Sequence, residues 1–396
     1  METIQSTSRV PGYSRMSLTE RAGLVAEFAN LNMEEKGTLT ALMRRRDSPA
    51  MDIGMNFRIN GEEYMVPMVT EEASVVPAAS NGARMVWNAG GFNAVYTGSA
   101  MNGQVLMREA KDAVLLQKLV NGKKEEIIEK ANELSTHIRM MDATFATIRH
   151  RNRAPTLAAN FIFDTGDAQG ANRINGQLEL AARMICELAG DECRSVKGIV
   201  TNLSNQRLVM VNAHVKAEDV GGREIAENIV WLSDVSNSGV RRSATEDESA
   251  MCRPVTENKG IMNGVEAVLR AMDNDTRAEH SAVEAYVSYR HAYHSLTMWE
   301  FDNAGNLMCK LTMPAQVAAR GGAVGLYDQS RIAKRILSRG NTEEFHVGEF
   351  ACVVGSVAVA NNLAAMRAIA DEGIQRGHMK IFEEQQGALS VMRRTS

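Results

Sequence analysis

The segment best suited to chemistry is residues 257–264, ENKGIMNG, in which a lysine stands close to two glycines. Glycine lets the backbone bend sharply and approach a ligand closely, so this pattern predicts a tight turn that presents Lys259. Apolar residues then recur at helical spacing up to residues 273–275, DND, and we expect this helix to bring Asp275 back toward the lysine. A lysine near a buried carboxylate can stabilise an oxyanion that forms on a carbonyl carbon. An ordinary loop with an exposed lysine would have the same pattern.

Two adjacent carboxylates, Glu71 and Glu72, follow a predicted strand. The alternation over residues 56–68, with Asn60-Gly61 between its halves, predicts a β-hairpin with a type I′ turn. Apolar neighbours at residues 75–76 and the proximity of a like charge would both raise a carboxyl pKa there, which suits a proton donor. A solvated carboxylate at the end of a strand is the alternative that the residues alone leave open.

Two further polar positions lie at predicted helix ends. Residues 167–172, DAQGAN, precede a helix, so their glycine and backbone N–H groups can approach a pyrophosphate at a helix N-terminus. A helix-capping loop would look the same. His378 stands just after Gly377, where a helix is predicted to break. A histidine at such a position is usually a surface or capping residue, and it can also act as a proton donor near neutral pH.

In this order and spacing, the motifs closely resemble those of 3-hydroxy-3-methylglutaryl-coenzyme A (HMG-CoA) reductase. The other segments that carry the resemblance are residues 66–76 (VPMVTEEASVV), 295–300 (SLTMWE) and 372–379 (EGIQRGHM). The similarity is greater to the short, soluble class II enzymes than to the membrane-anchored class. The resemblance implies an NAD(P)H-dependent reduction of HMG-CoA to mevalonate and coenzyme A. Two hydrides are needed, so one cleft must hold an aldehyde-level intermediate between them.

The resemblance also implies roles for individual residues. Lys259 would stabilise the oxyanion, Glu72 would supply protons, and Asp275 would hold the lysine–glutamate network and tune its pKa values. His378 would protonate the departing thiolate. The residues that match positions holding the hydroxymethylglutaryl group are Arg253, by pairing with the terminal carboxylate, Ser74 and Asn263. The residues that match nucleotide contacts are Asp167, Gln169, Gly170, Ala171, Asn172, Asn202 and Ser135.

The preference between the two nucleotides depends on the end of a charged helix predicted for residues 123–138. Relatives that use NADH can carry an acidic residue there, which binds the adenosine ribose hydroxyls, and by alignment this position is Ser135. A carboxylate would repel a 2′-phosphate. Its absence, together with His137 and Arg139 nearby, favours NADPH over NADH.

The alternation of elements predicts an α+β fold. Residues 1–105 and 209–380 are expected to form a large mixed helix and strand domain that carries the substrate site, and residues 381–396 a short tail. Strands and helices alternate within residues 106–208, which predicts an inserted small domain. The resemblance implies that this domain is ferredoxin-like and binds the nicotinamide nucleotide. The chain has no GxGxxG motif, in agreement with a site that is not a Rossmann fold.

Composition excludes several other classes. The net charge of −4 and pI near 6.1 exclude a general nucleic-acid binder, which needs a clustered positive excess. The N-terminus lacks an apolar signal region, and no run approaches the about 18 consecutive apolar residues of a membrane span, so we expect a cytoplasmic protein. The five cysteines are scattered without a CxxC pair, and neither a disulfide framework nor a metal site is predicted. The family's shared active site implies a homodimer or higher homo-oligomer.

Three departures from the family leave the substrate open. Residues 40–44 replace the family's ENVIG element, and the usual glycine-rich run is replaced around residues 140–147. Only eighteen residues follow His378, fewer than in the longer C-terminal flap of many class II enzymes. Two alternatives therefore remain: a reductase of another acyl thioester, and a non-catalytic paralogue that still binds nucleotide.

Overall fold

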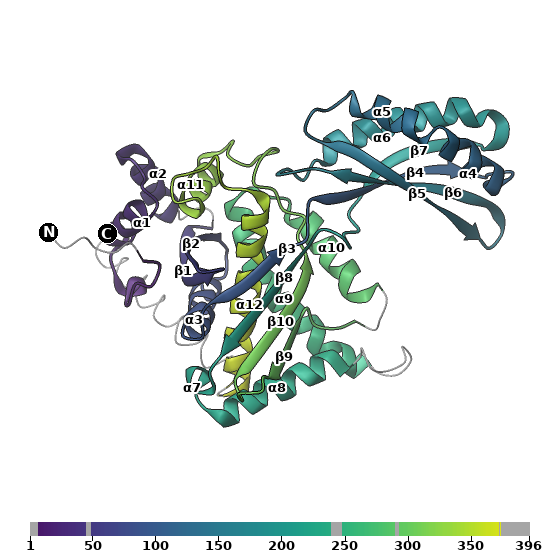
Figure 1. The fold of residues 1–396 in the computed structure, drawn as a ribbon. Coiled ribbons are helices and arrows are strands. Elements are labelled where there is room, and N and C mark those ends of the chain that lie inside the picture. The colour runs from purple at the N-terminus through teal and green to yellow at the C-terminus, as the bar shows by residue number, and fades with distance from the viewer. Residues whose placement is uncertain (1–6, 45–48, 239–247, 290–292, 372, 374–396) are drawn as a thin grey trace.

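The computed structural model describes residues 7–44, 49–238, 248–289, 293–371 and 373, and the strands in this part of the chain form two separate sheets (Figure 1). The first sheet has six strands in the order β2-β1-β3-β8-β10-β9. Its strands are β1 (Met51–Ile59), β2 (Glu62–Val69), β3 (Phe92–Tyr96), β8 (Leu208–Val215), β9 (Thr297–Phe301) and β10 (Leu307–Pro314). Because β3 pairs directly with β8, residues far apart in the chain are joined in one sheet, and the segment between them is an insertion.

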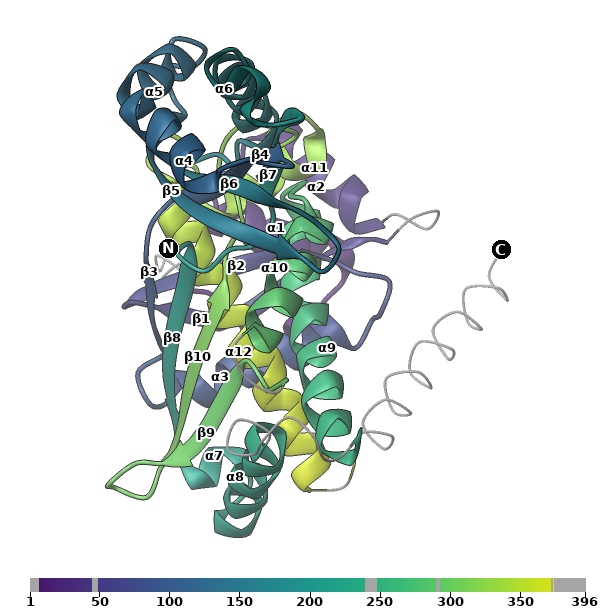
Figure 2. The ribbon, with the colours of Figure 1, turned by 90° about the vertical axis from the view of Figure 1, so that its right-hand side faces the viewer.

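Helices cover one face of this sheet, and α12 (Val347–Ala370) lies at their centre (Figure 2). It packs against α3 (Val75–Trp87), α8 (Arg223–Asn237), α9 (Glu248–Ala271) and strands β3 and β8. By length and composition α12 could cross a membrane, but 72% of its apolar window is buried inside the protein, as in a core helix. The remaining helices of this part are α1 (Leu18–Phe28), α2 (Met33–Arg44), α7 (Ala217–Val220), α10 (Thr276–Ser288) and α11 (Asp328–Leu337), with a short 3-10 turn at Tyr13–Arg15.

Small residues let the central helices approach each other closely. A Cβ added to Gly82 of α3 would lie 1.9 Å from the backbone oxygen of Ala360 in α12. A Cβ added to Gly264 of α9 would lie 3.0 Å from the Cβ of Asn361, also in α12. Helix backbones at this separation leave no room to slide past one another, since a packed core yields only at a cost. Helices α3, α9 and α12 are therefore fixed relative to each other.

The predicted hairpin is confirmed. Strands β1 and β2 pair antiparallel, with Ile59 opposite Glu62. Both turn residues have positive φ, 52° at Asn60 and 89° at Gly61, as a type I′ turn requires. The Asn60 side chain also donates to the carbonyl oxygen of Ala94 (2.9 Å) and accepts from its N–H (2.8 Å), which ties the turn to β3.

The prediction of a glycine turn at Lys259 is wrong, because residues 257–264 are helical. They lie inside α9, which runs from Glu248 to Ala271. Gly264 serves close packing against α12, whereas a side chain at Gly260 would meet no other atom within 4 Å. Twelve residues of helix, roughly 18 Å along the axis, separate Lys259 from Ala271. The helix therefore carries the chain away from the lysine instead of bringing Asp275 back to it.

The second sheet belongs to the inserted segment and lies beyond one end of the first sheet (Figures 1 and 2). Its four strands are antiparallel in the order β5-β6-β4-β7 and have their own apolar core. Its elements are β4 (Ala100–Arg108), α4 (Ala113–Gly122), α5 (Lys124–Asn132), β5 (Arg139–His150), β6 (Arg153–Asp164), α6 (Ala171–Ala189), a 3-10 turn (Gly190–Glu192) and β7 (Ser195–Thr201). This β-α-β-β-α-β order with two central strands is a ferredoxin-like arrangement, and it begins before the boundary expected at residue 106.

Candidate active site

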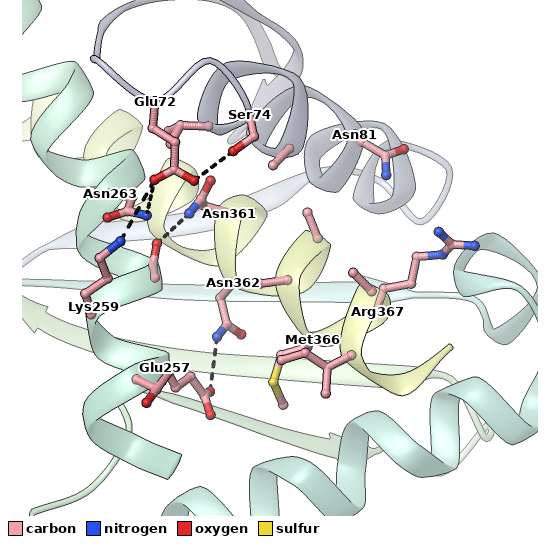
Figure 3. A pocket seen from close by; sticks show the side chains of 18 of the residues that line it. Glu72, Ser74, Asn81, Glu257, Lys259, Asn263, Asn361, Asn362, Met366 and Arg367 are labelled. Carbon is pink, nitrogen blue, oxygen red and sulfur yellow. Dashed lines mark hydrogen bonds and ion pairs between the residues drawn. The ribbon is translucent and has the colours of Figure 1, made fainter. Parts of the chain in front are cut away.

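Three helix segments enclose a cavity of about 550 Å³ (Figure 3). The start of α3, the middle of α9 and the second half of α12 provide its walls. Among the residues that line it are five that the sequence predicted for catalysis or substrate binding: Glu72, Ser74, Arg253, Lys259 and Asn263. Three separate stretches of sequence thus meet in one space, and the wall between their polar groups is mostly alanine, valine and proline.

Glu72 is at the centre of the polar contacts in this cavity (Figure 3). Its Oε1 accepts a hydrogen bond from the Ser74 hydroxyl at 2.8 Å. Its Oε2 accepts from the Asn263 side-chain amide at 3.4 Å and lies 3.9 Å from Nζ of Lys259. Lys259 and Asn263 are four residues apart, so α9 presents both on the same face. An ammonium, a carboxylate, a hydroxyl and an amide therefore surround one point in the cavity.

Glu71 is held away from this cluster. Its carboxylate pairs with the guanidinium of Arg270 at 2.6 Å, and its side chain is 70% exposed. A hydrogen bond to its own backbone, together with Arg270, lowers the pKa of Glu71. The expected pair of neighbouring carboxylates is therefore not formed, because Arg270, about three helical turns after Lys259 on α9, pairs with Glu71.

Arg253 and Glu257 form the floor of the cavity. One Nη of Arg253 lies 3.5 Å from Oε2 of Glu257 and 3.0 Å from the sulfur of Met366. Glu257 is only 4% exposed. A buried carboxylate needs hydrogen-bond donors to replace water, and its donors are the side chains of Ser236, Ser295, Thr297 and Asn362. This network holds the carboxylate in place, and the carboxylate in turn holds Arg253.

Asn361 is a site residue that the sequence analysis did not identify (Figure 3). Its amide donates to the carbonyl oxygen of Gly260 at 2.5 Å, which ties α12 to the helical turn that carries Lys259. The residue is 6% exposed and lines the cavity, and its Oδ1 has no hydrogen-bond partner in the described part of the chain. A buried acceptor without a partner favours a ligand that donates to it. Two asparagines in a row, within a mostly apolar stretch of sequence, were the signal that could have revealed it.

A second cavity, also of about 550 Å³, lies between the two sheets. One wall comes from the inserted segment and includes Ser135 and the predicted nucleotide residues Gln169, Gly170, Ala171 and Asn172. The other wall comes from the large part of the chain and includes residues 273–275 and 321–324. Helix α9 connects the two cavities, because its middle lines the first and the residues just after its end line the second.

The N-terminus of helix α6 lines the second cavity and can bind an anion there. Gly170 is the N-cap residue with a φ of 82°, and no side chain caps the helix. The first-turn N–H groups of an uncapped helix are free to bind an anion, with the helix dipole favouring negative charge. The φ of 82° is a left-handed conformation that favours glycine, and a Cβ at Gly170 would also come within 2.6 Å of the terminal methyl group of Ile138. His137 and Arg173 also line this cavity, whereas Arg139 does not.

Asp275 belongs to the second cavity, whereas Lys259 belongs to the first. Its Oδ1 accepts from the backbone N–H groups of Arg277 and Ala278, at 3.1 and 3.2 Å, and thereby caps α10. The carboxylate that actually meets Lys259 is that of Glu72. His378 lies outside the described residues.

Two of the residues predicted to bind nucleotide make structural contacts instead of lining the second cavity. Asp167 accepts from the backbone N–H of Val347 and from His346, both at 2.8 Å, so it caps the start of α12. Burial acts to raise the pKa of Asp167, but these bonds and Arg320 hold it below its ordinary value. Asn202 is exposed, and its backbone oxygen accepts from the Gln316 side chain at 2.6 Å.

Comparisons with known proteins agree with this geometry. The sequence model described as hydroxymethylglutaryl-coenzyme A reductase matches residues 50–382. The chain belongs to this family. Similar relatives include HMG-CoA reductase of Archaeoglobus fulgidus, 34% identical over 392 residues that cover 95% of this chain and 86% of the relative.

Solved HMG-CoA reductase structures share the whole fold. A structure of the Streptococcus pneumoniae enzyme superposes with a TM-score of 0.81 at 29% identity, over 96% of this chain and 91% of that one. A second, described as a class II HMG-CoA reductase bound to NADPH in open conformations, gives 0.79 at 29% identity, over 91% and 99%. The α+β fold and the HMG-CoA reductase resemblance predicted from the sequence are thus confirmed.

Proposed function

We propose that this protein reduces 3-hydroxy-3-methylglutaryl-CoA to mevalonate and coenzyme A with NAD(P)H. The observation that carries the proposal is the meeting of Lys259, Glu72, Asn263 and Arg253 in one cavity whose walls are otherwise mostly apolar. A positive charge next to a carboxylate suits a carbonyl that becomes an oxyanion and then takes a proton. A second cavity with an uncapped helix N-terminus supplies a place for the nucleotide.

Each residue has a distinct part in this chemistry. Lys259 stabilises the oxygen of the thioester carbonyl as negative charge develops on it, and Glu72 gives protons to that oxygen. Asn263 and Ser74 orient Glu72, since both donate hydrogen bonds to its carboxylate. They also bind the acyl group of the substrate. Arg253, fixed by Glu257, pairs with the terminal carboxylate of the substrate.

The remaining groups act on the nucleotide and on the coenzyme A leaving group. Bound NAD(P)H supplies the hydride for each of the two reductions. The first-turn N–H groups of α6, next to Gly170, would hold its pyrophosphate, and Asp275 lies on the opposite wall of that cavity. His378 protonates the thiolate of coenzyme A as it leaves.

NADPH is expected to be the better nucleotide. The wall of the second cavity carries Ser135, His137 and Arg173, so no carboxylate stands at the position aligned with the ribose-binding acid of NADH-using relatives. Asp273 and Asp275 lie on the other wall. We predict a kcat/KM for NADPH several-fold above that for NADH, about 1 kcal/mol in favour of the 2′-phosphate. A clearly higher kcat/KM with NADH would contradict this preference.

We also propose a cytoplasmic homodimer or larger homo-oligomer with the cleft near the subunit boundary. Exposed apolar side chains gather on two helices next to the cavity: Trp231 and Val235 of α8, and Met251 and Val255 of α9. Met251 and Val255 are four residues apart and therefore share one face of α9, whose other side lines the cavity, so a partner covering them would lie next to the helix that carries Arg253 and Lys259. Sedimentation at assay concentrations is expected to show no monomer. An active monomer would contradict the proposal.

The test of function is an assay of nucleotide oxidation with HMG-CoA as acyl substrate, monitored by the absorbance of the reduced nicotinamide. The same assay with acetyl-CoA and succinyl-CoA tests the acyl group, because only a substrate with a suitably spaced carboxylate can reach Arg253 from the Lys259 end. Folded protein that oxidises NADPH with another thioester but not with HMG-CoA, or with none of them, would contradict the proposed function.

A further inference from the structure

A fully buried arginine lies where the chain passes between the two sheets. Arg207 is 0% exposed, and it is the residue just before β8, at the return from the inserted segment to the first sheet. No carboxylate of the described residues forms an ion pair with it. Its guanidinium instead donates to four oxygens, which are Thr165 Oγ1 (2.7 Å), Ala168 O (3.2 Å), Ala315 O (3.0 Å) and Val317 O.

These four acceptors come from two segments that lead to opposite walls of the second cavity. Residues 165–168 run directly into Gln169 and Gly170, at the start of α6. Residues 315–317 run into Ala318 and then residues 321–324, which face them across the cavity. The Thr165 hydroxyl extends the contact, since it donates to Ala168 O at 2.7 Å while it accepts from Arg207.

The segment 315–320 is itself fixed to the rest of the molecule. Its Gln316 N–H donates to Glu279 at 2.7 Å, and Ala318 exchanges two hydrogen bonds with the side chain of Asn274, at 2.6 and 3.1 Å. The backbone N–H groups of Ala319 and Arg320 donate to the carbonyl oxygen of Asp167, so two hydrogen bonds near the Arg207 contacts also join the segment to the loop before α6. The segment is thus a fixed support, and Arg207 holds the loop before α6 against it.

Burying a guanidinium without a carboxylate partner is costly. Burial lowers the pKa of Arg207, and the nearby Glu279, also 0% exposed, has its pKa raised by burial to about 8. An apolar side chain of similar volume would avoid this cost. What only arginine offers is a planar group with five donors in fixed directions, able to bind two separate segments at once.

We propose that Arg207 is a positioning residue for the nucleotide, which sets the distance between the two walls of the second cavity. The proposal rests on the function above only in naming NAD(P)H as the ligand. Arg207 does not line the first cavity and makes no hydrogen bond to the polar groups described there. Its replacement should therefore weaken nucleotide binding and leave acyl-thioester binding nearly unchanged.

The test is direct titration of NADPH, followed by its fluorescence, with wild type and Arg207→Lys. We expect the Kd to rise about tenfold, equivalent to ~1.4 kcal/mol, because lysine cannot bind both segments. The KM for the acyl thioester should change by less than about twofold. The control is Arg335→Lys, because Arg335 also donates to backbone oxygens, those of Gly340 (2.7 Å) and Asn30 (3.0 Å), pairs with Glu35 and lines neither cavity. It should lower the melting temperature without changing the NADPH Kd.

A second pair of variants keeps the test valid if Arg207→Lys does not fold. Thr165→Val removes the oxygen that accepts from Arg207, whereas Thr165→Ser retains it. Only the valine variant should raise the NADPH Kd. The proposal is overturned if a folded Arg207→Lys or Thr165→Val shows an unchanged Kd, or if both substrates lose affinity equally. Wild type that binds NADPH but does not reduce HMG-CoA would contradict the proposed function while leaving this test intact. Wild type that does not bind NADPH would overturn both.

Discussion

Replacing Lys259 with alanine is expected to lower kcat with HMG-CoA by about a thousandfold, the scale seen when a group that stabilises an oxyanion is lost. Its ammonium lies 3.9 Å from the Glu72 carboxylate, and it projects into the cavity from a helix that packs closely against α12. The side chain is 70% exposed, and its one ion pair among the described residues, with Glu72, is long. The melting temperature should therefore stay within about 2 °C of wild type, since surface changes usually cost under about 0.5 kcal/mol.

The matched control is Lys130→Ala, which removes a lysine from a surface pair with Glu133 at 2.9 Å on the inserted segment. It should retain the wild-type kcat. Titration of NADPH with Lys259→Ala should also give the wild-type Kd, because Lys259 does not line the second cavity. Turnover by folded Lys259→Ala at near the wild-type rate would remove the lysine from the mechanism.

Changing Glu72 to glutamine is expected to lower kcat by about 10²- to 10⁴-fold, the range for loss of a general acid. Glutamine has the same shape, and its amide oxygen can still accept from Ser74, so the cavity should keep its form. What is lost is the transferable proton and the negative charge beside Lys259. Measurement of kcat and KM by nucleotide oxidation separates this from a binding effect, because a lost proton donor lowers kcat and leaves KM similar.

The neighbouring residue provides the control for Glu72. Glu71→Gln makes the same chemical change one residue earlier, on a side chain that is 70% exposed and held by Arg270. Its kcat should stay within about twofold of wild type, because a surface ion pair contributes little. Equal losses in the two variants would mean that the strand end, and not the carboxylate of Glu72, is what activity requires.

The features that the sequence predicted correctly depend on short-range chemistry. Asn60-Gly61 specifies its turn through the backbone angles of two adjacent residues, and the structure has that turn. The lysine segment was mispredicted for the opposite reason. Gly264 there allows a close contact with Asn361, about a hundred residues later in the chain, and no local pattern reports such a contact.

In the candidate site, too, the sequence predicted the local motifs but not the long-range contacts between them. The motifs located Glu72, Lys259, Asn263 and Arg253, but their convergence depends on how α3 and α9 pack on α12. Asn361 was missed because its role arises only once the carbonyl oxygen of Gly260 lies beside it. Asp275 was placed with the lysine because the segment was predicted to turn, and a continuous helix instead puts it at the other cavity.

The most direct measurement of the central claim is the ratio of NADPH oxidised to coenzyme A thiol released, with HMG-CoA as the limiting substrate. Reduction of a thioester to a primary alcohol consumes two hydrides and releases one thiol. We predict two molecules of NADPH oxidised for each thiol released, with mevalonate as the product. A ratio of one, with an aldehyde released, would contradict the account, as would the absence of HMG-CoA-dependent oxidation by folded protein.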